Sequence, residues 1–355
     1  MGVLQSEPET DRIFIQKASK LLNQGKWEGF LLKWAKALES YGTPRTFVDS
    51  TTYRKVQIDF QSKPYYFVYT VSKNYAQRSA LMAQQQPYLS QKREEDYKLR
   101  LDLANCFLCQ NVVQGLDAKA YPEKVENNIM YDLGTHVIIP NRYPGQLGHS
   151  LSLPKDHDEL FTRVTPQPEP ENKTTIYHPE KGKTRGAILS SDYLAAVIKA
   201  CDKFHLAAIR NHVLDGMSIP GHDHFHLMPE DLPSVSLGDI VAGEKVSTEY
   251  GPTIFRPGNS PFDTLMVLGD AESIALTATP ILSTMELNDQ VFTLAYHQGK
   301  LFISPRNKDS VNDRRIQVGG GIPIHYLDTE GPEFINRINR LVPMKGDYGW
   351  EHFLP

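Results

Sequence analysis

The first part of the chain carries apolar residues at helical spacing. They recur every three or four positions across residues 11–41, and Gly25 interrupts them, so we predict two helices joined by a short turn. Residues 55–60 then alternate apolar and polar side chains, and residues 65–69 are more uniformly apolar, which predicts two strands. Residues 75–103 are polar and charged and favour a solvated helix or connector.

The rest of the chain alternates between strand and helix patterns. Strands are predicted over residues 127–140, 148–154, 264–268, 273–277, 291–296 and 301–304. Helices over residues 192–210 and 333–340 and a Pro- and Gly-rich surface loop over residues 165–186 complete the pattern. Ser190 or Ser191 is expected to cap the first of these helices, and Gln298-Gly299 to turn the last strand pair into a hairpin. Together these elements indicate an α+β fold with antiparallel sheet.

Composition narrows the class of protein. The chain has 355 residues, 40% of them hydrophobic, and a formal net charge of −4, values typical of soluble globular proteins. No stretch approaches the ~18 consecutive apolar residues of a membrane helix. The N-terminus has no signal-peptide pattern, so we expect a cytoplasmic protein without a membrane partner. Mild acidity argues against a nucleic-acid polymer, whose binding requires many neutralised phosphates, but leaves small anionic ligands open.

Cysteines are too few for a disulfide framework. Cys201 lies on the predicted helix over residues 192–210, where a small buried hydrophobe needs no further role. Cys106 and Cys109 form a CxxC pair, a spacing that zinc sites and redox pairs share. The surrounding sequence does not have the βαβ pattern expected around a thioredoxin-like redox pair, so zinc and two buried thiols remain the alternatives.

The run His222-Asp223-His224-Phe225-His226-Leu227-Met228 places histidines at every second position. On a strand, this alternation puts all three imidazoles on one face and the intervening residues on the other. Imidazoles pack poorly in an apolar core, because each ring brings two nitrogens that need partners. The pattern therefore favours metal ligands or a nucleophile with supporting groups, and a hydrogen-bonded strand face is the structural alternative.

This run resembles the His-x-His-x-His motif of the histidine-triad (HIT) superfamily. Upstream segments are similar to that family's strand-turn-strand pattern, namely Asn141-Arg142-Tyr143-Pro144, Gly148-His149-Ser150-Leu151 and Pro154-Lys155-Asp156-His157. Asn211, Gly216 and Ser218 resemble its Asn-x-Gly and Gly-x-Ser elements, and the CxxC lies where zinc-containing members carry theirs. The chain length resembles the branch that contains galactose-1-phosphate uridylyltransferase, dinucleoside tetraphosphate phosphorylase and GDP-galactose phosphorylase.

The resemblance implies an enzyme in which the middle histidine, His224, attacks the α-phosphorus of a nucleotide and holds the NMP covalently. A neutral imidazole is a competent nucleophile near pH 7, and splitting the transfer into two steps predicts ping-pong kinetics. Ser218 and the backbone N–H groups of residues 216–221 are the candidate donors to the phosphoryl oxygens. The implied substrate is a nucleoside polyphosphate or a nucleotide sugar.

His226 departs from the pattern of that branch, whose transferase and phosphorylase members mostly carry Gln at the third position of the motif. The hydrolases of the superfamily carry His there. An imidazole can move a proton to or from water, whereas an amide cannot. The spacing from Ser218 to His222 is that of the GDP-galactose phosphorylase type, so we place nucleotidyltransferase or phosphorylase first and nucleotide hydrolase second. A nucleotide-binding protein without turnover is the third hypothesis.

Further substrate contacts follow from the same resemblance. Asn141 stands where the family usually carries an acid that holds the ribose hydroxyls, and it equally suits a turn before Tyr143-Pro144. Asn211 and Gly216 belong to the predicted substrate-binding set as well. Candidate cations for the phosphates are Arg142, Lys155, Lys183, Arg185 and Arg306, although a residue of this type, taken alone, is more often a solvated surface residue.

The family's zinc ligands map onto Cys106, Cys109, His157 and His222, with His149 as the alternative third ligand. Four protein ligands close a tetrahedral Zn²⁺ site, so the ion would be structural and would tie the cysteine segment to the histidine strand. We divide the chain into residues 1–104, a HIT-like core over residues 105–232 and a strand-rich half over residues 233–355. The oligomeric state, monomer or homodimer, stays open.

Overall fold

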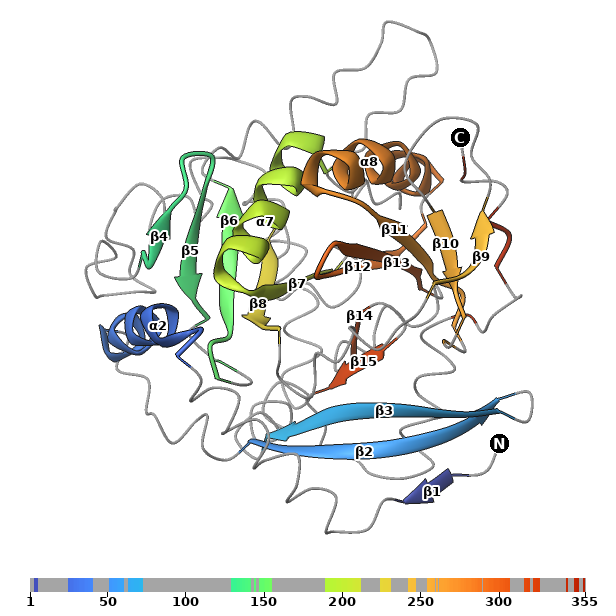
Figure 1. The fold of residues 1–355 in the computed structure, drawn as a ribbon, viewed down its shortest axis with the longest axis horizontal. Coiled ribbons are helices and arrows are strands. Elements are labelled where there is room, and N and C mark those ends of the chain that lie inside the picture. The colour runs from blue at the N-terminus through green and yellow to red at the C-terminus, as the bar shows by residue number, and fades with distance from the viewer. Residues whose placement is uncertain are drawn as a thin grey trace, which may run out of the picture.

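The computed structural model describes residues 3–5, 25–40, 51–60, 63–72, 129–141, 144, 147–154, 189–211, 224–230, 242–246, 254–258, 260, 262–288, 290–306, 316–319, 322–325, 343, 348–350 and 354. A large antiparallel sheet with two helices on one face dominates this part of the chain (Figure 1). No helix among the described residues is long and apolar enough to cross a membrane.

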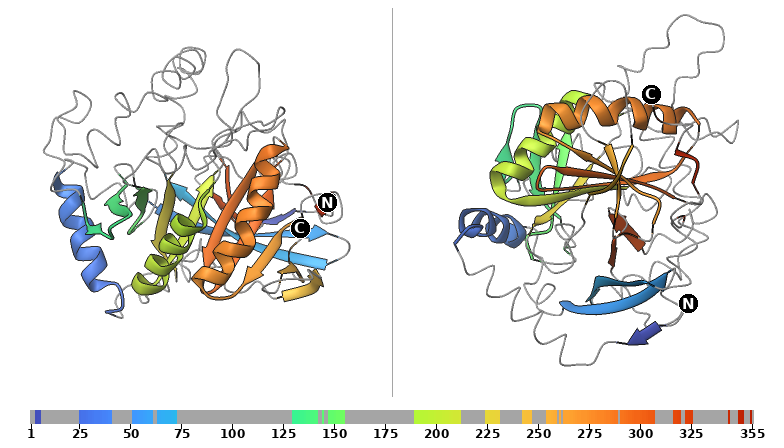
Figure 2. Two further views of the ribbon diagram at one scale, coloured as in Figure 1. Left: turned by 90° about the horizontal axis from the view of Figure 1, so that it is seen from above. Right: turned by 45° about the vertical axis from the view of Figure 1, so that its right-hand side comes forward.

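Ten strands make up the main sheet within the described residues, and every pair of neighbours is antiparallel. Their order is β4 (Tyr131–Asp132), β5 (His136–Pro140), β6 (Ser150–Pro154), β8 (Phe225–Pro229), β7 (Leu206–Asn211), β12 (Phe292–His297), β13 (Lys300–Pro305), β11 (Leu265–Leu268), β10 (Ile254–Pro257) and β9 (Ala242–Val246). Helices α7 (Ser191–Phe204) and α8 (Ala271–Leu287) lie side by side across it (Figure 2).

The main sheet contains an internal repeat. In chain order, the described elements run β4-β5-β6-α7-β7-β8 and then β9-β10-β11-α8-β12-β13. Counted from the outer edge, the strands of each half have the same order, and the halves meet where β7 pairs with β12. His226 therefore belongs to β8, the last strand of the first half in chain order, and His224 immediately precedes that strand.

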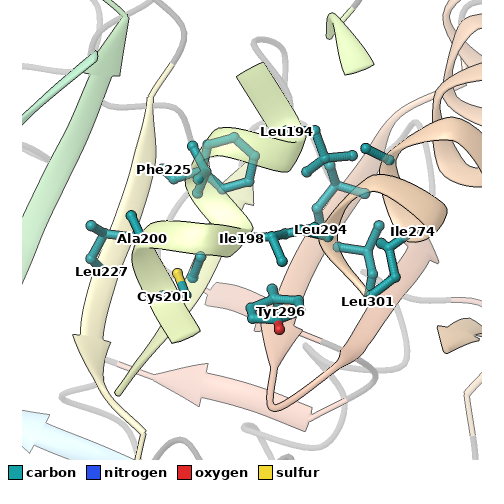
Figure 3. Packing of buried hydrophobic residues seen from close by; sticks show 14 of the residues in the cluster. Leu194, Ile198, Ala200, Cys201, Phe225, Leu227, Ile274, Leu294, Tyr296 and Leu301 are labelled. Atoms are coloured by element: carbon teal, nitrogen blue, oxygen red, sulfur yellow. The ribbon is translucent and has the colours of Figure 1, made fainter. Parts of the chain in front are cut away.

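The hydrophobic core fills the space between the two helices and the sheet. Figure 3 shows Leu194 and Ile198 of α7 packed toward Leu294 of β12, with Ile274 of α8 close by. Phe225 of β8 also belongs to this cluster, as do alternate residues of the neighbouring strands. We call the opposite face of the main sheet, which is turned away from α7 and α8, the distal face.

Smaller elements complete the described structure. Helix α2 (Glu28–Ser40) contacts β5, and β1 (Val3–Gln5), β2 (Thr51–Phe60) and β3 (Lys63–Ser72) form a separate antiparallel sheet. The hairpin of β14 (Ile316–Gly319) and β15 (Ile322–His325) lies between this sheet and the main one, since β14 contacts β12 and β13 while β15 contacts β3 (Figure 1).

Several predicted elements are confirmed. The second N-terminal helix, the strand pair at residues 55–69 and the hairpin around Gln298-Gly299 are all present, and both hairpin residues adopt positive φ. Cys201 is fully buried, as expected. Ser190, rather than Ser191, caps α7, because its side chain accepts a hydrogen bond from the Tyr193 N–H.

Three predictions of element type or length are wrong. The strand over residues 127–140 is a hairpin of β4 and β5, turned near Gly134 at φ 87°. The helix over residues 192–210 ends at Phe204, because His205 adopts the left-handed conformation and the following residues form a strand buried on both faces. Residues 273–277 are part of α8 rather than a strand.

The reason for the third error is the composition of α8. Its β-branched and hydroxyl residues resemble a strand in a short window, yet the side chains that it buries recur at helical spacing over four turns, namely Ile274, Ala275, Ala278, Ile281, Leu282 and Met285. Asp270 begins the helix by accepting a hydrogen bond from the Ser273 N–H at 2.8 Å. The predicted first helix before Gly25, the connector 75–103, the loop 165–186 and the helix 333–340 lie outside the described residues.

Candidate functional site

Two histidines of the predicted motif lie side by side at β8. Their ring centroids are 5.1 Å apart, with the planes at 65°. Phe225 and Leu227, the alternate residues, belong to the core under α7, so His224 and His226 lie on the distal face. The alternation predicted for this run is thus observed for the two histidines that the structure describes; His222 lies outside the described residues.

His226 is joined to a third histidine from the neighbouring strand. His149 immediately precedes β6, and its Nε2 lies 2.9 Å from Nδ1 of His226. The side-chain nitrogen of Asn141 lies 3.2 Å from the same Nε2. An amide nitrogen can only donate, so His149 Nε2 acts as the acceptor and the hydrogen between the two rings belongs to His226 Nδ1.

That tautomer leaves Nε2 of His226 as an acceptor. Within the described part of the chain, this nitrogen is buried and has no hydrogen-bond partner. A buried lone pair without a partner is uncommon, because burial removes the water that would otherwise satisfy it. His226 Nε2 is therefore placed to accept a hydrogen bond from a group that enters the site.

Burial also sets the charge of these rings. His149, His224 and His226 are at most 4% exposed. Burial, together with the nearby His224, lowers the pKa of His149 to about 3. Burial lowers the pKa of His226 well below its ordinary value, and His224 and His149 add to the effect. Both His149 and His226 are consequently neutral at pH 7.

Local backbone geometry holds His149 in place. Gly148 has φ 73°, and a Cβ at this position would meet the Pro229 ring at 2.8 Å, so the end of β8 packs directly on this turn. The indole N–H of Trp34 in α2 donates to the His149 carbonyl at 2.9 Å. Sequence reasoning missed Trp34, because no local pattern indicates which carbonyl a helix will reach across the fold.

Surroundings of the histidines differ on the two sides of β8. Toward the sheet edge, the distal face carries the apolar side chains of Val137, Ile139, Leu151 and Leu153, all buried. Toward the sheet centre, continuing the β7–β8 register by two residues places Asn211 opposite His224, and Asn211 pairs with Thr293 of β12. The histidine pair thus lies at a boundary between an apolar surface and a polar one.

The predicted site residues divide into three groups. His224, His226 and Asn211 come together on the distal face, and Asn141 joins them through His149. Arg306 is buried directly after β13, three strands away from β8. Ser218, Gly216, Arg142, Lys183, Cys106, Cys109, His157 and His222 lie outside the described residues, as do Lys155 and Arg185.

Among the described residues, no three His, Cys, Asp or Glu side chains lie together in a way that would hold a metal ion. All four ligands predicted for zinc are outside that set.

Comparison with known proteins gives a distant match. No family model matches the sequence, and no curated protein matches it. Three solved structures of yeast Ap4A phosphorylase Apa2 do match. The complex with AMP has 9% sequence identity and a TM-score of 0.45 and covers 88% of this chain, and the protein alone has 9% identity and a TM-score of 0.47 and covers 90%. The complex with Ap4A has 11% identity and a TM-score of 0.44 and covers 88% of this chain; each match covers 97% of the Apa2 chain. These proteins are of the dinucleoside tetraphosphate phosphorylase kind, the branch that the motifs resemble. With TM-scores below 0.5, the match supports no inference about this chain's activity.

Proposed function

We propose that this protein is a nucleotidyltransferase or phosphorylase. It acts at the α-phosphate of a nucleoside polyphosphate or a nucleotide sugar through a covalent His224–NMP intermediate. The observation that carries the proposal is the position of His224 on the distal face. It lies beside a buried, neutral His226 and between an apolar surface and a polar one.

The chemistry has two steps. A ring nitrogen of His224 attacks the α-phosphorus, a P–N bond forms, and the P–O bond to the leaving group breaks with its electrons going to oxygen. The oxygen of an acceptor then attacks the same phosphorus and displaces His224. A hydroxyl or protonated phosphate acceptor must lose a proton in this step, and His226 Nε2 is the buried acceptor beside the nucleophile.

The two surfaces beside His224 suit the two ends of such a substrate. A planar base would pack against the apolar side chains on the edge side of β8, because removing its ring faces from water is favourable. These side chains are Val137, Ile139, Leu151 and Leu153. Asn211 lies on the other side, toward which the phosphates would extend. Asn141, Arg142, Gly216, Ser218, Lys183 and Arg306 remain proposed contacts of the ribose and the phosphates.

Hydrolysis is the second candidate function. Within the described residues, Nε2 of His226 has no hydrogen-bond partner, which favours hydrolysis because an imidazole acceptor can also take a proton from an attacking water molecule. In both reactions the first step is the same, so only the acceptor of the second step separates them.

Acid-quenched incubation with α-labelled nucleotides tests the common first step. The expected result is an acid-labile, base-stable protein–NMP adduct that His224→Ala abolishes and His205→Asn retains. His205 is the matched control because it lies at the end of α7 and half of its side chain is exposed. If no nucleotide forms an adduct, the enzyme hypotheses are wrong and the remaining hypothesis is a nucleotide-binding protein without turnover. Release of NMP to water rather than to phosphate or a sugar phosphate would identify a hydrolase.

We also propose a structural zinc ion bound by Cys106, Cys109, His157 and His222. Two thiolates and two imidazoles form a donor set that Zn²⁺ prefers in closed tetrahedral sites. When bound, the ion would supply rigidity, since it would connect the cysteine pair to the segment that precedes His224. The expected outcome is one zinc per chain by elemental analysis, lost in His157→Ala together with part of the thermal stability; unchanged zinc in that variant would reassign the third ligand.

A further inference from the structure

A row of polar side chains crosses the distal face from His224 toward the second half of the repeat. Asn211 of β7 pairs with Thr293 of β12, and Thr293 pairs with Ser304 of β13. Continuing the β11–β13 register by one residue places Thr264 opposite Ser304, and their hydroxyl oxygens are 3.0 Å apart. We call Asn211, Thr293, Ser304 and Thr264 the polar row.

The polar row is buried yet incompletely hydrogen-bonded. Its four members are at most 2% exposed. Within the described residues, the Thr293 hydroxyl and both side-chain atoms of Asn211 have no hydrogen-bond partner. A buried polar group without a partner destabilises the fold, so adjacent ones are rarely retained unless a ligand or water supplies the missing bonds.

The row lies on the same face as His224 and within reach of its substrate. Neighbouring strands are about 4.8 Å apart, which puts Asn211 about 5 Å and Thr293 about 10 Å from the His224 position across the sheet. Alternation along β8, β7 and β12 points His224, Asn211 and Thr293 away from the core, to which Phe225, Ala208 and Leu294 belong. A group that extends from the phosphorus attacked by His224 toward β12 would therefore reach Asn211 first and then Thr293, next to β14, which contacts β12 and β13.

The chemistry of the row suits an anion. Three hydroxyls and one carboxamide can all donate hydrogen bonds, and the row contains no carboxylate that would repel negative charge. Arg306 follows two residues after Ser304, directly after the end of β13, and is buried, which places a permanent positive charge near the row. Buried hydroxyls and amides beside a guanidinium are typical of sites that hold phosphoryl oxygens.

We propose that the polar row is a second phosphoryl subsite, which binds the phosphate of the leaving group in the first step and of the acceptor in the second. The proposal rests on the proposed function and deepens it, because it selects phosphate-bearing acceptors over water. It also assigns a role to each half of the repeat: β8 and β7 supply His224 and Asn211, while the second half supplies Thr293, Ser304 and Thr264.

Direct binding of pyrophosphate, measured by calorimetry on the full chain, tests the subsite without requiring turnover. Thr293→Val removes one buried hydroxyl at constant shape, and we expect it to weaken pyrophosphate binding about tenfold, as loss of a hydrogen bond to a charged group does. Thr293→Ser should restore most of the affinity. Asn211→Asp, of the same shape, should abolish binding, because it puts a negative charge in the row.

Thr279→Val is the matched control, since its hydroxyl donates to the Ala275 carbonyl on α8, away from the distal face. This variant should bind pyrophosphate as wild type does. Equal affinities in wild type, Thr293→Val and Asn211→Asp, with all three folded by circular dichroism, would overturn the subsite, as would undetectable binding to wild type.

The outcomes for the two proposals are distinguishable. A wild-type chain that binds pyrophosphate but never forms a His224–NMP adduct would retain the subsite and overturn the proposed function. A chain that forms the adduct but discharges it to phosphate with the same half-saturation in wild type and Thr293→Val would retain the function and overturn the subsite.

Discussion

Gly148 forms the turn that immediately precedes His149, whose ring contacts that of His226. Its φ of 73° is strained for any residue with a Cβ, and that Cβ would lie 2.8 Å from the Pro229 ring. Gly148→Ala should therefore lower the free energy of unfolding by about 2–4 kcal/mol, through backbone strain and overpacking together. Urea titration followed by circular dichroism measures it.

Gly134 supplies the control for this prediction. Its φ of 87° is equally unfavourable for Ala, but a Cβ there meets nothing within 4 Å. Gly134→Ala should cost only the strain, about 1 kcal/mol. Equal losses in the two variants would mean that the contact with Pro229 has no energetic weight.

His149 and His226 make stability depend on pH. Both pKa values are lowered on folding, that of His149 from 6.5 to about 3, so the unfolded chain binds more protons between those pH values. The contribution of these two histidines to the free energy of unfolding is therefore complete above pH 6.5 and is lost as the pH falls toward 3. The slope is at most about 1.4 kcal/mol per pH unit for each group.

His149→Gln removes one of these groups and should flatten the loss of stability between pH 7 and pH 5. Thr279→Val, which removes no titratable group, should leave the slope unchanged. Urea unfolding across that pH range measures both; a parallel loss in wild type and His149→Gln would contradict the lowered pKa of His149.

At this scale, the sequence predicts the pair on β8 but not its partner. Alternation alone places His224 and His226 on one face. The contact of His226 with His149 depends on the pairing of β6 with β8, which are 70 residues apart in the chain. Register between such distant strands leaves no local pattern, so His149 could be assigned only as a structural residue or an alternative zinc ligand.

Helix α2 shows how one element fixes another at a distance. Trp34 donates to the His149 carbonyl and Trp27 to the His205 carbonyl, each at 2.9 Å. Trp34→Phe and Trp27→Phe keep most of the apolar burial but remove one of the two hydrogen bonds that each carbonyl accepts, the other coming from the Asn141 or Glu230 backbone N–H, so each should cost about 1 kcal/mol of stability.

The two substitutions should differ in their effect on the site. Trp34→Phe removes one hydrogen bond from the His149 carbonyl, next to Gly148, and should shift the ¹⁵N resonances of the His149 and His226 rings. Trp27→Phe acts at the far end of β7 and should leave them in place. Identical ring spectra in wild type and Trp34→Phe would show that α2 stabilises the fold without positioning His149.

Element type was predictable where a pattern ran long enough. The hairpin at Gln298-Gly299 and the helix after Gly25 have unambiguous periods and turn residues. The end of α7 at Phe204 was not predictable, because residues 206–209 are an uninterrupted apolar run that suits a buried helix or a buried strand equally. His205, in the left-handed conformation, decides between them.

Across the whole molecule, the sequence indicates an antiparallel α+β fold but not the strand order. The predicted boundary at residue 232 falls between β8 and β9, the junction of the two halves of the repeat. Both halves nevertheless share one sheet, joined by the β7–β12 pair, and one hydrophobic cluster that contains residues from each. The division of the chain into domains stays a prediction.

This shared sheet predicts that the two halves unfold together. Separating them would remove the partner of a fully buried central strand on each side and expose the cluster under α7 and α8. The chain's three tryptophans report on different regions, Trp27 and Trp34 beside the first half and Trp350 near the C-terminal end. A Trp27→Phe, Trp34→Phe double variant and a Trp350→Phe variant each restrict fluorescence to one region. In both, the fluorescence and circular dichroism transitions in urea should coincide, and a separation in either variant would show that the halves are independent folding units.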